Sequence, residues 1–203
     1  GSLEITVTAD SNGAVDESNV DGTGETNNAS SITKSSALAP YPDLQVGGLS
    51  VAQSSLQSGG PLTVRWNDTN LGDGTASGTW HDRVRVVNTT TGATLLDVYL
   101  ANAAAIAPAG SLAREYSFTL PDGSAGAGDL SIQVTADAWN AVYEYAADGT
   151  AETNNDASIT ASSALAPYPD LLVDALSIVQ PSLTSGGVAT IRWTDANSGN
   201  GAA

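Results

Sequence analysis

The sequence predicts an all-β protein built from repeated antiparallel sandwich modules, and three observations lead to this prediction. Apolar and polar residues alternate along short segments, which is the pattern of half-buried strands rather than of helices. Clusters of glycine, proline, asparagine and aspartate separate these segments, as turns between strands require. The sequence also repeats itself with a period of 127 residues.

The repeat is unusually regular. When the chain is shifted by 127 residues, positions 3–76 align with positions 130–203 without a gap, and 46 of the 74 pairs are identical. The run SSALAPYPDL occurs twice, as do shorter strings such as VTAD, ETNN and R-W-x-D-x-N. A period of this length indicates a whole domain rather than one turn of a solenoid.

The alignment divides the chain into one complete period and two partial ones. We expect residues 39–165 to form a complete β-sandwich repeat, residues 1–38 to be the C-terminal part of one repeat, and residues 166–203 to be the N-terminal part of the next. Partial repeats leave apolar faces and strand edges without partners. We therefore expect the two ends to be disordered or paired, for example by strand complementation head-to-tail between molecules.

The strands of the complete repeat follow in order from the alternation. The first carries Leu44 and Val51 at its ends and is interrupted at residues 47–48 by two glycines, which indicate a bulge or a switch of the strand between sheets. The next strand places Leu62, Val64 and Trp66 on one face. The later strands are marked by Val84 and Val86; by Leu96, Val98 and Leu100; by Tyr116, Phe118 and Leu120; by Leu130, Ile132 and Val134; and by Ile159.

About seven strands in one period, each with a single buried face, predict an immunoglobulin-like antiparallel β-sandwich. Trp66, which recurs as Trp193, lies in the middle of a strand on its apolar face. A buried tryptophan is common in such sandwiches, so we predict that Trp66 belongs to the core. Trp80 lies beside a polar turn and Trp139 lies in a polar segment, so the pattern assigns neither of them.

The composition excludes several classes of partner. The chain has 22 Asp and Glu against 6 Lys and Arg, a formal charge of −16, and no cysteine. Such a chain repels nucleic acid and anionic lipid, so we expect no nucleic-acid partner. No apolar run approaches the roughly 20 residues that a membrane helix needs, so we expect no membrane insertion. The absence of cysteine excludes a disulfide scaffold but fits both the cytosol and the cell exterior.

Five segments of the complete repeat carry a resemblance to a known family: PDLQVGGLSV, LTVRWNDTNLGDGTA, TWHDRV, TLPDG and LSIQVTADAWNAVYEYAADGTAETNN. In this order they resemble CARDB, the cell-adhesion-related domain found in bacteria. The resemblance implies an immunoglobulin-like sandwich that is repeated in secreted or cell-surface bacterial proteins, without catalytic activity, and it names no ligand. The chain departs from the pattern by its length near residues 79–100 and by Trp139, where the first fragment has Asn12.

The last of these segments, which we call the closing block, is a candidate calcium site. Calcium binds oxygen ligands from carboxylates, amides and carbonyls, and the block is rich in them, although its spacing is not that of an EF-hand loop. The alternative is that these are solvated loop acids in turn conformations. The candidate ligands are Asp10, Asn12, Glu17, Asp21, Glu25, Asn27 and Asn28 in the first fragment, and Asp137, Glu144, Asp148, Glu152, Asn154 and Asn155 in the complete repeat.

The linkers between repeats are predicted to be short and stiff, because each contains two prolines that fix φ and extend the preceding residue. Within them, Leu38 and Tyr41 are the apolar side chains that we expect to dock on a neighbouring module. The predicted linker and interface residues are Leu38, Pro40, Tyr41, Pro42 and Asp43 in one linker, and Leu165, Pro167, Tyr168, Pro169 and Asp170 in the other.

The motifs of common enzymes are absent from the sequence, and we predict no catalytic residue. His81 is the only histidine and lies at the start of an ordinary alternating strand. We therefore expect a stalk, or extender, module of a repetitive surface adhesin, with neighbouring repeats as its partners and calcium as a candidate cofactor. One alternative is a module that grips a glycan or a protein with Trp80, Trp139, Tyr143 and Tyr145. A weaker alternative is an accessory domain of a secreted hydrolase.

Overall fold

The computed structural model describes residues 1–203, and almost all of the regular structure is β-strand. The chain separates into two compact units, Gly1–Pro40 and Tyr41–Ala203, and each is described by itself. No helix in the structure has the length and apolar character needed to span a membrane.

The first unit is a two-stranded hairpin. Strand β1 (Ser2–Thr8) pairs antiparallel with β2 (Ala29–Ser35), and a short 3-10 helix, η1 (Gly24–Thr26), lies in the connection between them. Leu3, Ile5 and Val7 of β1 are 50% to 68% exposed. The apolar face of this hairpin is therefore uncovered.

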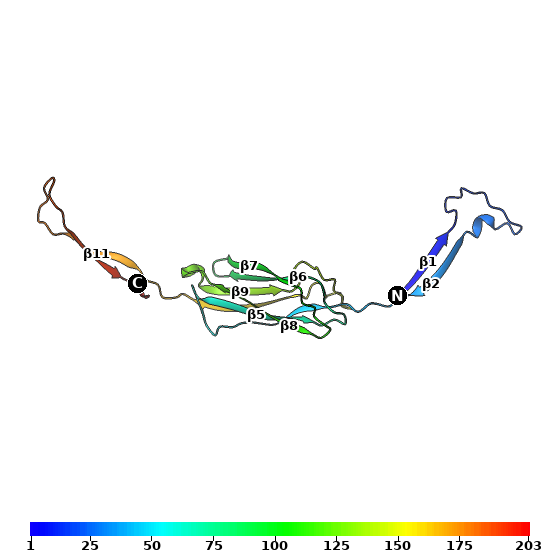
Figure 1. The fold of residues 1–203 in the computed structure, drawn as a ribbon, viewed down its shortest axis with the longest axis horizontal. Helices are drawn as coiled ribbons and strands as arrows, with labels where there is room; N and C mark the ends of the chain where they lie inside the picture. Colours follow the sequence, from blue (N-terminus) through cyan, green and yellow to red (C-terminus); the bar gives the residue numbers. More distant parts are fainter. The chain divides into compact units, whose positions relative to one another are not determined.

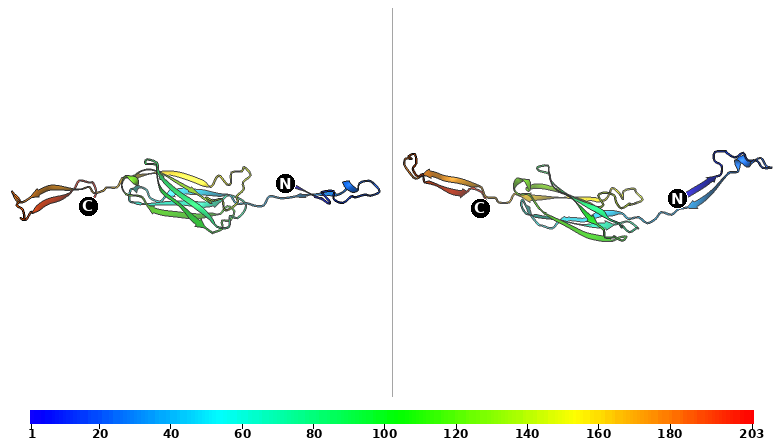
Figure 2. Two further views of the ribbon diagram at one scale, coloured as in Figure 1. Left: turned by 90° about the horizontal axis from the view of Figure 1, so that it is seen from above. Right: turned by 45° about the horizontal axis from the view of Figure 1, so that its top comes forward.

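The second unit contains the complete module, drawn from cyan to yellow in Figures 1 and 2. Its elements are β3 (Leu44–Val51), β4 (Leu56–Gln57), β5 (Pro61–Asn70), β6 (Trp80–Asn88), β7 (Ala93–Asn102), β8 (Ser111–Thr119), η2 (Gly123–Ala125), β9 (Gly128–Thr135) and β10 (Asp156–Ala164). They form one sheet in the order β4-β10-β9-β6-β7 and a second in the order β3-β5-β8. Every pairing is antiparallel except that of β4 with β10.

The predicted all-β antiparallel sandwich is confirmed, with one correction to the strand count. The complete module has eight strands rather than about seven, because the two residues of β4 pair in parallel with the end of β10. A strand of two residues has no alternation of its own, so the sequence pattern could not reveal it. The bulge predicted in the first strand is present, as a register shift between Gly47 and Ser50 with a φ of 62° at Gly48.

The main hydrophobic core lies between the two sheets. Trp66 on β5 is 1% exposed, which confirms its prediction as the core tryptophan. Large inward-facing side chains at these positions each contribute about 1.5–3 kcal/mol when they are removed from water. The buried members of this cluster are Leu56, Leu62, Val64, Trp66, Val84, Val86, Leu120, Leu130, Ile132 and Val134.

A second, smaller cluster lies at the end of the module where the chain enters. It contains Leu44, Ala76, Trp80, Ile106 and Val142, all buried. Ala76 and Ile106 also exchange two backbone hydrogen bonds of 3.0 Å as an isolated bridge. The connection between β5 and β6 is thereby joined to the connection between β7 and β8 at this end.

The chain enters the complete module at one end and leaves it at the other (Figures 1 and 2). The beginning of β3 lies opposite the end of β5, since Leu44 pairs with Asn70. The end of β10 lies beside β4, since Ala164 pairs with Gln57. The two linkers of this module are therefore held at opposite ends of the sandwich.

Residues after the complete module form another hairpin, in which β11 (Leu171–Ile178) pairs antiparallel with β12 (Ile191–Asn197). Both partial repeats are thus paired internally. The bulge of β3 recurs in β11 as a register shift between Asp174 and Ser177, with a φ of 51° at Ala175. The same backbone irregularity therefore forms although alanine replaces the glycine of the complete copy.

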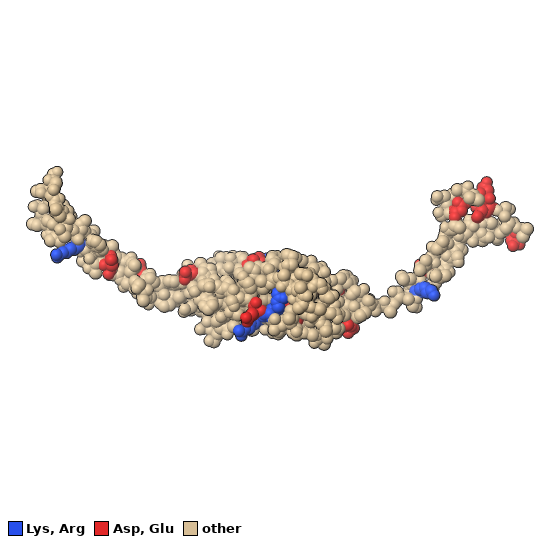
Figure 3. All heavy atoms as spheres, viewed as in Figure 1, with Lys and Arg blue, Asp and Glu red and all other residues tan.

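On the complete module, most of the surface drawn in Figure 3 has neither acidic nor basic side chains. On the complete module, Arg83 forms a two-pronged ion pair with Asp97 at 2.7 and 2.6 Å, and Arg65 lies 3.2 Å from Glu115. These pairs are largely exposed, and exposed pairs contribute little to stability.

The two copies of the core tryptophan provide a matched test of the sandwich. Replacing Trp66 with alanine is expected to lower the free energy of unfolding by about 3–5 kcal/mol, because it opens a large cavity between the sheets. Trp193→Ala, at the equivalent position, removes a side chain that is 56% exposed, so the expected change is within about 0.5 kcal/mol. Urea denaturation followed by circular dichroism measures both changes, and equal losses would contradict the assignment of the core.

Candidate functional site

In the complete module the closing block, residues 130–155, begins within β9, and its residues 136–155 are the long connection between β9 and β10. Asp137 is buried and has a φ of 41°. Its Oδ1 accepts a hydrogen bond of 2.9 Å from the Ala141 amide, and its Oδ2 accepts one of 2.7 Å from the Val142 amide. The carboxylate thereby closes the turn around itself, which is a common role of aspartate in loops.

Glu144 joins the closing block to the first strand. The side chain is 2% exposed, and its two oxygens accept hydrogen bonds from the Leu44 amide and from Asn155 Nδ2, the latter at 2.9 Å. Burial raises the pKa of Glu144 to about 7, and the neighbouring carboxylates of Glu152 and Asp137 add to this rise. The two donors act in the opposite direction by stabilising the charged form.

The closing block also holds the linker that enters its own module. Asn154 Nδ2 donates to Asp43 Oδ1 at 3.0 Å, and the Tyr145 amide donates to the Pro42 carbonyl at 3.1 Å. These contacts join residues about a hundred positions apart in the sequence. The closing block is therefore part of the joint at the beginning of the module, although it lies near the end of the period.

The same clamps recur in the first unit. Asp10 has a φ of 42° and accepts hydrogen bonds from the Ala14 and Val15 amides at 2.9 and 2.8 Å. The Glu17 amide donates to Glu25 as the Glu144 amide donates to Glu152. The two closing blocks thus share one hydrogen-bond pattern at an offset of 127 residues.

Six of the thirteen candidate calcium ligands accept hydrogen bonds from the backbone, namely Asp10, Glu25, Asp137, Glu144, Asp148 and Glu152. The structure has no group of three or more His, Cys, Asp or Glu side chains that could hold a metal ion. Asp148 accepts hydrogen bonds from the amide and the hydroxyl of Thr150, at 3.1 and 2.7 Å, and forms none with another candidate ligand. Three buried oxygens nevertheless have no donor, namely Glu152 Oε2, Asn154 Oδ1 and Asn155 Oδ1. Calcium binding by this block stays a prediction.

The linker that leaves the complete module is bound at the other end of the sandwich. The Ala166 amide donates to Ser58 Oγ at 2.9 Å, and the Gly123 amide donates to the Tyr168 hydroxyl at 2.8 Å. Leu165 remains 61% exposed, whereas Tyr168 is half-buried. Of the apolar linker side chains, the tyrosine therefore makes the contact with the module.

The aromatic residues that we considered as a ligand-binding site do not form one cluster; they are Trp80, Trp139, Tyr143 and Tyr145. Trp80 is fully buried in the smaller core cluster, so it cannot contact a ligand. Tyr143 and Tyr145 pack against Tyr41, with ring centroids 5.3 and 5.9 Å apart. These two tyrosines of the closing block therefore contact the entering linker.

Trp139 forms a separate exposed stack. Its ring centroid lies 4.1 Å from that of His81 and 5.2 Å from that of Tyr99, and the side chain is 58% exposed. The lone histidine thus lies in a surface aromatic cluster on the β6 and β7 side of the module.

Sequence reasoning missed a buried charged group between the two core clusters. Asp68 on β5 and Asp82 on β6 are both fully buried, and Arg114 on β8 lies 3.8 Å from the first and 3.4 Å from the second. Trp66 Nε1 also donates to Asp68 Oδ1 at 3.0 Å. The signal was present in the R-W-x-D-x-N string, because Asp68 follows Trp66 by two residues and so continues the inward face.

One arginine faces two buried carboxyls in this group. Burial and the adjacent charge of Asp82 raise the pKa of Asp68 to about 8, and burial also raises the pKa of Asp82. Both oxygens of Asp82 lack a hydrogen-bond donor. Near neutral pH the group therefore favours holding a proton, which balances the single positive charge of Arg114.

The fold is an all-β sandwich module, and hydrogen bonds hold a linker at each of its two ends. No family model and no curated protein matches the chain. Among solved structures, the chain is similar to the crystal structure of the CARDB domain of the PF1109 protein in complex with di-metal ions from Pyrococcus furiosus. The identity is 21% and the TM-score 0.43, with 64% of this chain and 100% of that chain covered. This is the family that the sequence segments resemble.

Two further structures show the range of the likeness. The solution structure of the same Pyrococcus furiosus CARDB domain matches with 22% identity and a TM-score of 0.45, over 63% of this chain and 100% of that chain. A β-glucosidase from Erythrobacter marinus matches with 10% identity and a TM-score of 0.40, over 60% of this chain but 15% of the enzyme chain.

The buried acids predict that stability falls as the pH rises. Asp68 and Glu144 have folded-state pKa values of about 8 and 7, above the roughly 4 of the unfolded chain, so the folded state binds more protons between these limits. Their contribution is complete below about pH 4 and is lost as the pH rises through 7 and 8. Urea denaturation at pH 5, 7 and 9 is expected to show a steady decrease in the free energy of unfolding.

Asp68→Asn is expected to flatten this decrease, since it removes the group with the higher of the two pKa values. Asp195→Asn is the matched control, because Asp195 occupies the equivalent position in the partial repeat and is exposed. A pH dependence that is the same in both variants would contradict the role of the buried group.

Proposed function

We propose that this chain is a non-catalytic extender module of a repetitive bacterial surface or secreted adhesin. The observation that carries the proposal is that the chain enters the complete module at one end and leaves it at the other, with both linkers hydrogen-bonded to the sandwich. A module of this kind adds its full length to a tandem array. Each module therefore increases the distance between the two ends of the array.

The strand arrangement supports a load-bearing role. A pulling force along the chain acts on β3 and β10, which belong to different sheets and run along the length of the module. The ladders of β3 with β5 and of β10 with β9 lie parallel to this force, so their hydrogen bonds are loaded together in shear rather than opened one at a time. Backbone clamps at Asp137 and Glu144 hold the connection between β9 and β10 closed under the same load.

A ligand-binding function is the alternative. What favours it is the exposed stack of Trp139 on His81 and Tyr99. Against it, the other aromatic side chains considered for such a site are buried or occupied by the entering linker. Trp139 is also replaced by Asn12 in the neighbouring copy, whereas the residues that clamp the linkers recur. The extender function therefore accounts for more of the module.

Single-molecule pulling tests the extender function. The chain has no cysteine, so attachment points can be introduced one pair at a time. Pulling between Ala39→Cys and Ala166→Cys is expected to give one high-force event that releases roughly 400 Å, from an extended reach of about 3.3–3.6 Å per residue less the length of the folded module. The control pair, Pro61→Cys and Thr119→Cys, lies directly opposite on β5 and β8 and opens a ladder one bond at a time.

The force between residues 39 and 166 is expected to be clearly the higher of the two. If both pairs yield at the same force, the module has no resistance specific to its long direction, and the extender function is wrong.

Calcium stiffening of the joint is a finer part of the proposal. It is supported by the three buried oxygens of Glu152, Asn154 and Asn155 that have no donor, since calcium prefers oxygen ligands of this kind. Asn154 also holds Asp43 of the entering linker. An ion at these oxygens would therefore act on the joint as well as on the loop.

Thermal unfolding with calcium and with excess chelator tests this part. Binding to the folded state alone raises the melting temperature by roughly 10 °C at a free concentration a hundredfold above Kd, for a module of this size. Magnesium at the same concentration serves as the control ion, because it retains its own waters and requires a stricter octahedral site. Identical melting curves in calcium and chelator would show that the block is held by its hydrogen bonds alone.

A further inference from the structure

The tyrosine of each linker lies where two modules meet, and the two copies in this chain show the two halves of its environment. Tyr168 follows the complete module, and Tyr41 precedes it. They occupy the same position in the run SSALAPYPDL. The contacts of one with the preceding module and of the other with the following module can therefore be combined.

The preceding module provides a socket for the hydroxyl group. The Tyr168 oxygen lies 2.8 Å from the Gly123 amide, and 3.1 Å from both Ser58 Oγ and Asp122 Oδ1. Ser58 is buried and also accepts from the Ala166 amide. We call Ser58, Asp122 and Gly123 the hydroxyl socket.

The hydrogen bonds in the socket balance. A phenol has one proton to donate and an oxygen that can accept two hydrogen bonds. The single proton of the Tyr168 hydroxyl is donated to Asp122 Oδ1 or to Ser58 Oγ, and its oxygen accepts from the Gly123 amide. Ser58 in turn accepts from Ala166, so each polar group of the socket has a partner.

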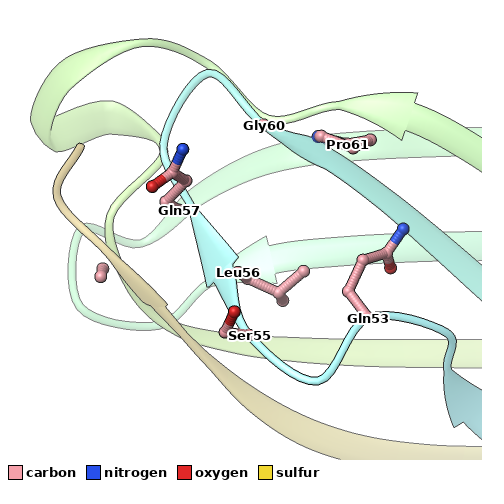
Figure 4. A pocket seen from close by; sticks show the side chains of 7 residues that line it. Gln53, Ser55, Leu56, Gln57, Gly60 and Pro61 are labelled. Carbon is pink, nitrogen blue, oxygen red and sulfur yellow. The ribbon is translucent and has the colours of Figure 1, made fainter.

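The shape of the socket depends on a glycine. Gly59 has a φ of +73°, and a Cβ at this position would lie 2.3 Å from Asp122 Oδ1 and 3.4 Å from the Tyr168 oxygen. Ser58, Gly59 and Gly60 recur in the next repeat as residues 185–187. Near the socket, β4 and the end of β10 border a pocket whose lining includes Leu56, Gln57 and Gly60 (Figure 4).

The following module holds the other parts of the tyrosine. The Tyr41 carbonyl accepts a hydrogen bond of 2.9 Å from the Gly74 amide, and the Tyr168 carbonyl accepts the equivalent bond of 3.0 Å from Gly201. The Tyr41 ring packs edge-on against Tyr143 at 5.3 Å and lies 5.9 Å from Tyr145. Edge-to-face pairs of this kind contribute about 0.5–1.5 kcal/mol beyond their buried area.

We propose that one tyrosine locks each joint of the array, with its hydroxyl in the socket of the preceding module and its backbone and ring held by the following one. Bending the joint then requires the hydroxyl network or the carbonyl and ring contacts to break. In the hydroxyl half, Tyr168 and Ser58 recur as Tyr41 and Ser185, whereas in the ring half Tyr143 and Tyr145 are replaced by Asp16 and Ser18 in the other closing block. The proposal rests on the extender function, for which joint stiffness matters.

Hydrogen exchange in the whole chain tests the hydroxyl half. Tyr168→Phe keeps the ring but removes the acceptor of the Gly123 amide, so the exchange of this amide is expected to rise about five- to tenfold, the equivalent of one lost hydrogen bond. Tyr41→Phe is the matched control and is expected to leave Gly123 unchanged. In both variants the Gly74 amide retains its carbonyl acceptor, so its exchange reports that the fold is intact.

The joint itself is measured by 15N relaxation of β11 and β12. In the unaltered chain these strands are expected to share the tumbling of the sandwich more closely than in Tyr168→Phe. Unchanged Gly123 exchange, or unchanged relaxation, in Tyr168→Phe would overturn the proposal. Either result is distinct from failure of the extender function, which is judged from the pulling force of a single module.

Discussion

The two sheets of the complete module are stable because each covers the apolar face of the other. The tryptophans at the equivalent positions of two repeats show how much burial this contact provides. Trp66 is 1% exposed in the sandwich, and Trp193 is 56% exposed in a hairpin that lacks the second sheet. The same holds for Leu130 and Leu3, which are 0% and 55% exposed. Strand formation and backbone pairing are alike in the two situations, so the difference lies in the sheet-to-sheet contact. Hydrophobic burial between sheets is thus a property of the complete period.

The polar interior of the sandwich imposes a second constraint. Asp68, Asp82 and Arg114 come from three strands and from both sheets, and they separate the main core from the smaller cluster around Trp80. A buried charge without its partner costs several kcal/mol, so the group favours the alignment of the sheets that brings Arg114 close to both carboxyls.

At the two ends of the module, backbone groups of the linkers are held by side chains distant in sequence. Glu144 accepts from the Leu44 amide at one end, and Ser58 accepts from the Ala166 amide at the other. Because side-chain acceptors fix the direction of the backbone that leaves the sandwich, the proline-containing linkers start from defined positions. The acidic composition that suggested a metal site is, in the structure, to a large extent a set of acceptors for the module's own amides.

The sequence by itself determined the repeat, the strands that carry alternating apolar residues, and the place of Trp66 in the core. Alternation with a period of two identifies the inward face of a strand wherever large apolar residues occupy it, as for Leu62, Val64 and Trp66. The glycine pair in the first strand similarly indicated its bulge, because a positive φ favours glycine. These features are local, so they can be derived without knowing what packs against the strand.

Only the tertiary structure decided which distant residues meet. Asp68 lies on the inward face that alternation assigns to Trp66, but its meeting with Asp82 and Arg114 follows from the packing of the two sheets. The hydroxyl socket joins Ser58 to Asp122 and Tyr168, and the closing block reaches Asp43 across more than a hundred residues. Contacts of this kind depend on the order of strands and on which end each loop occupies. Alternation carries no information about either, because it describes one strand at a time.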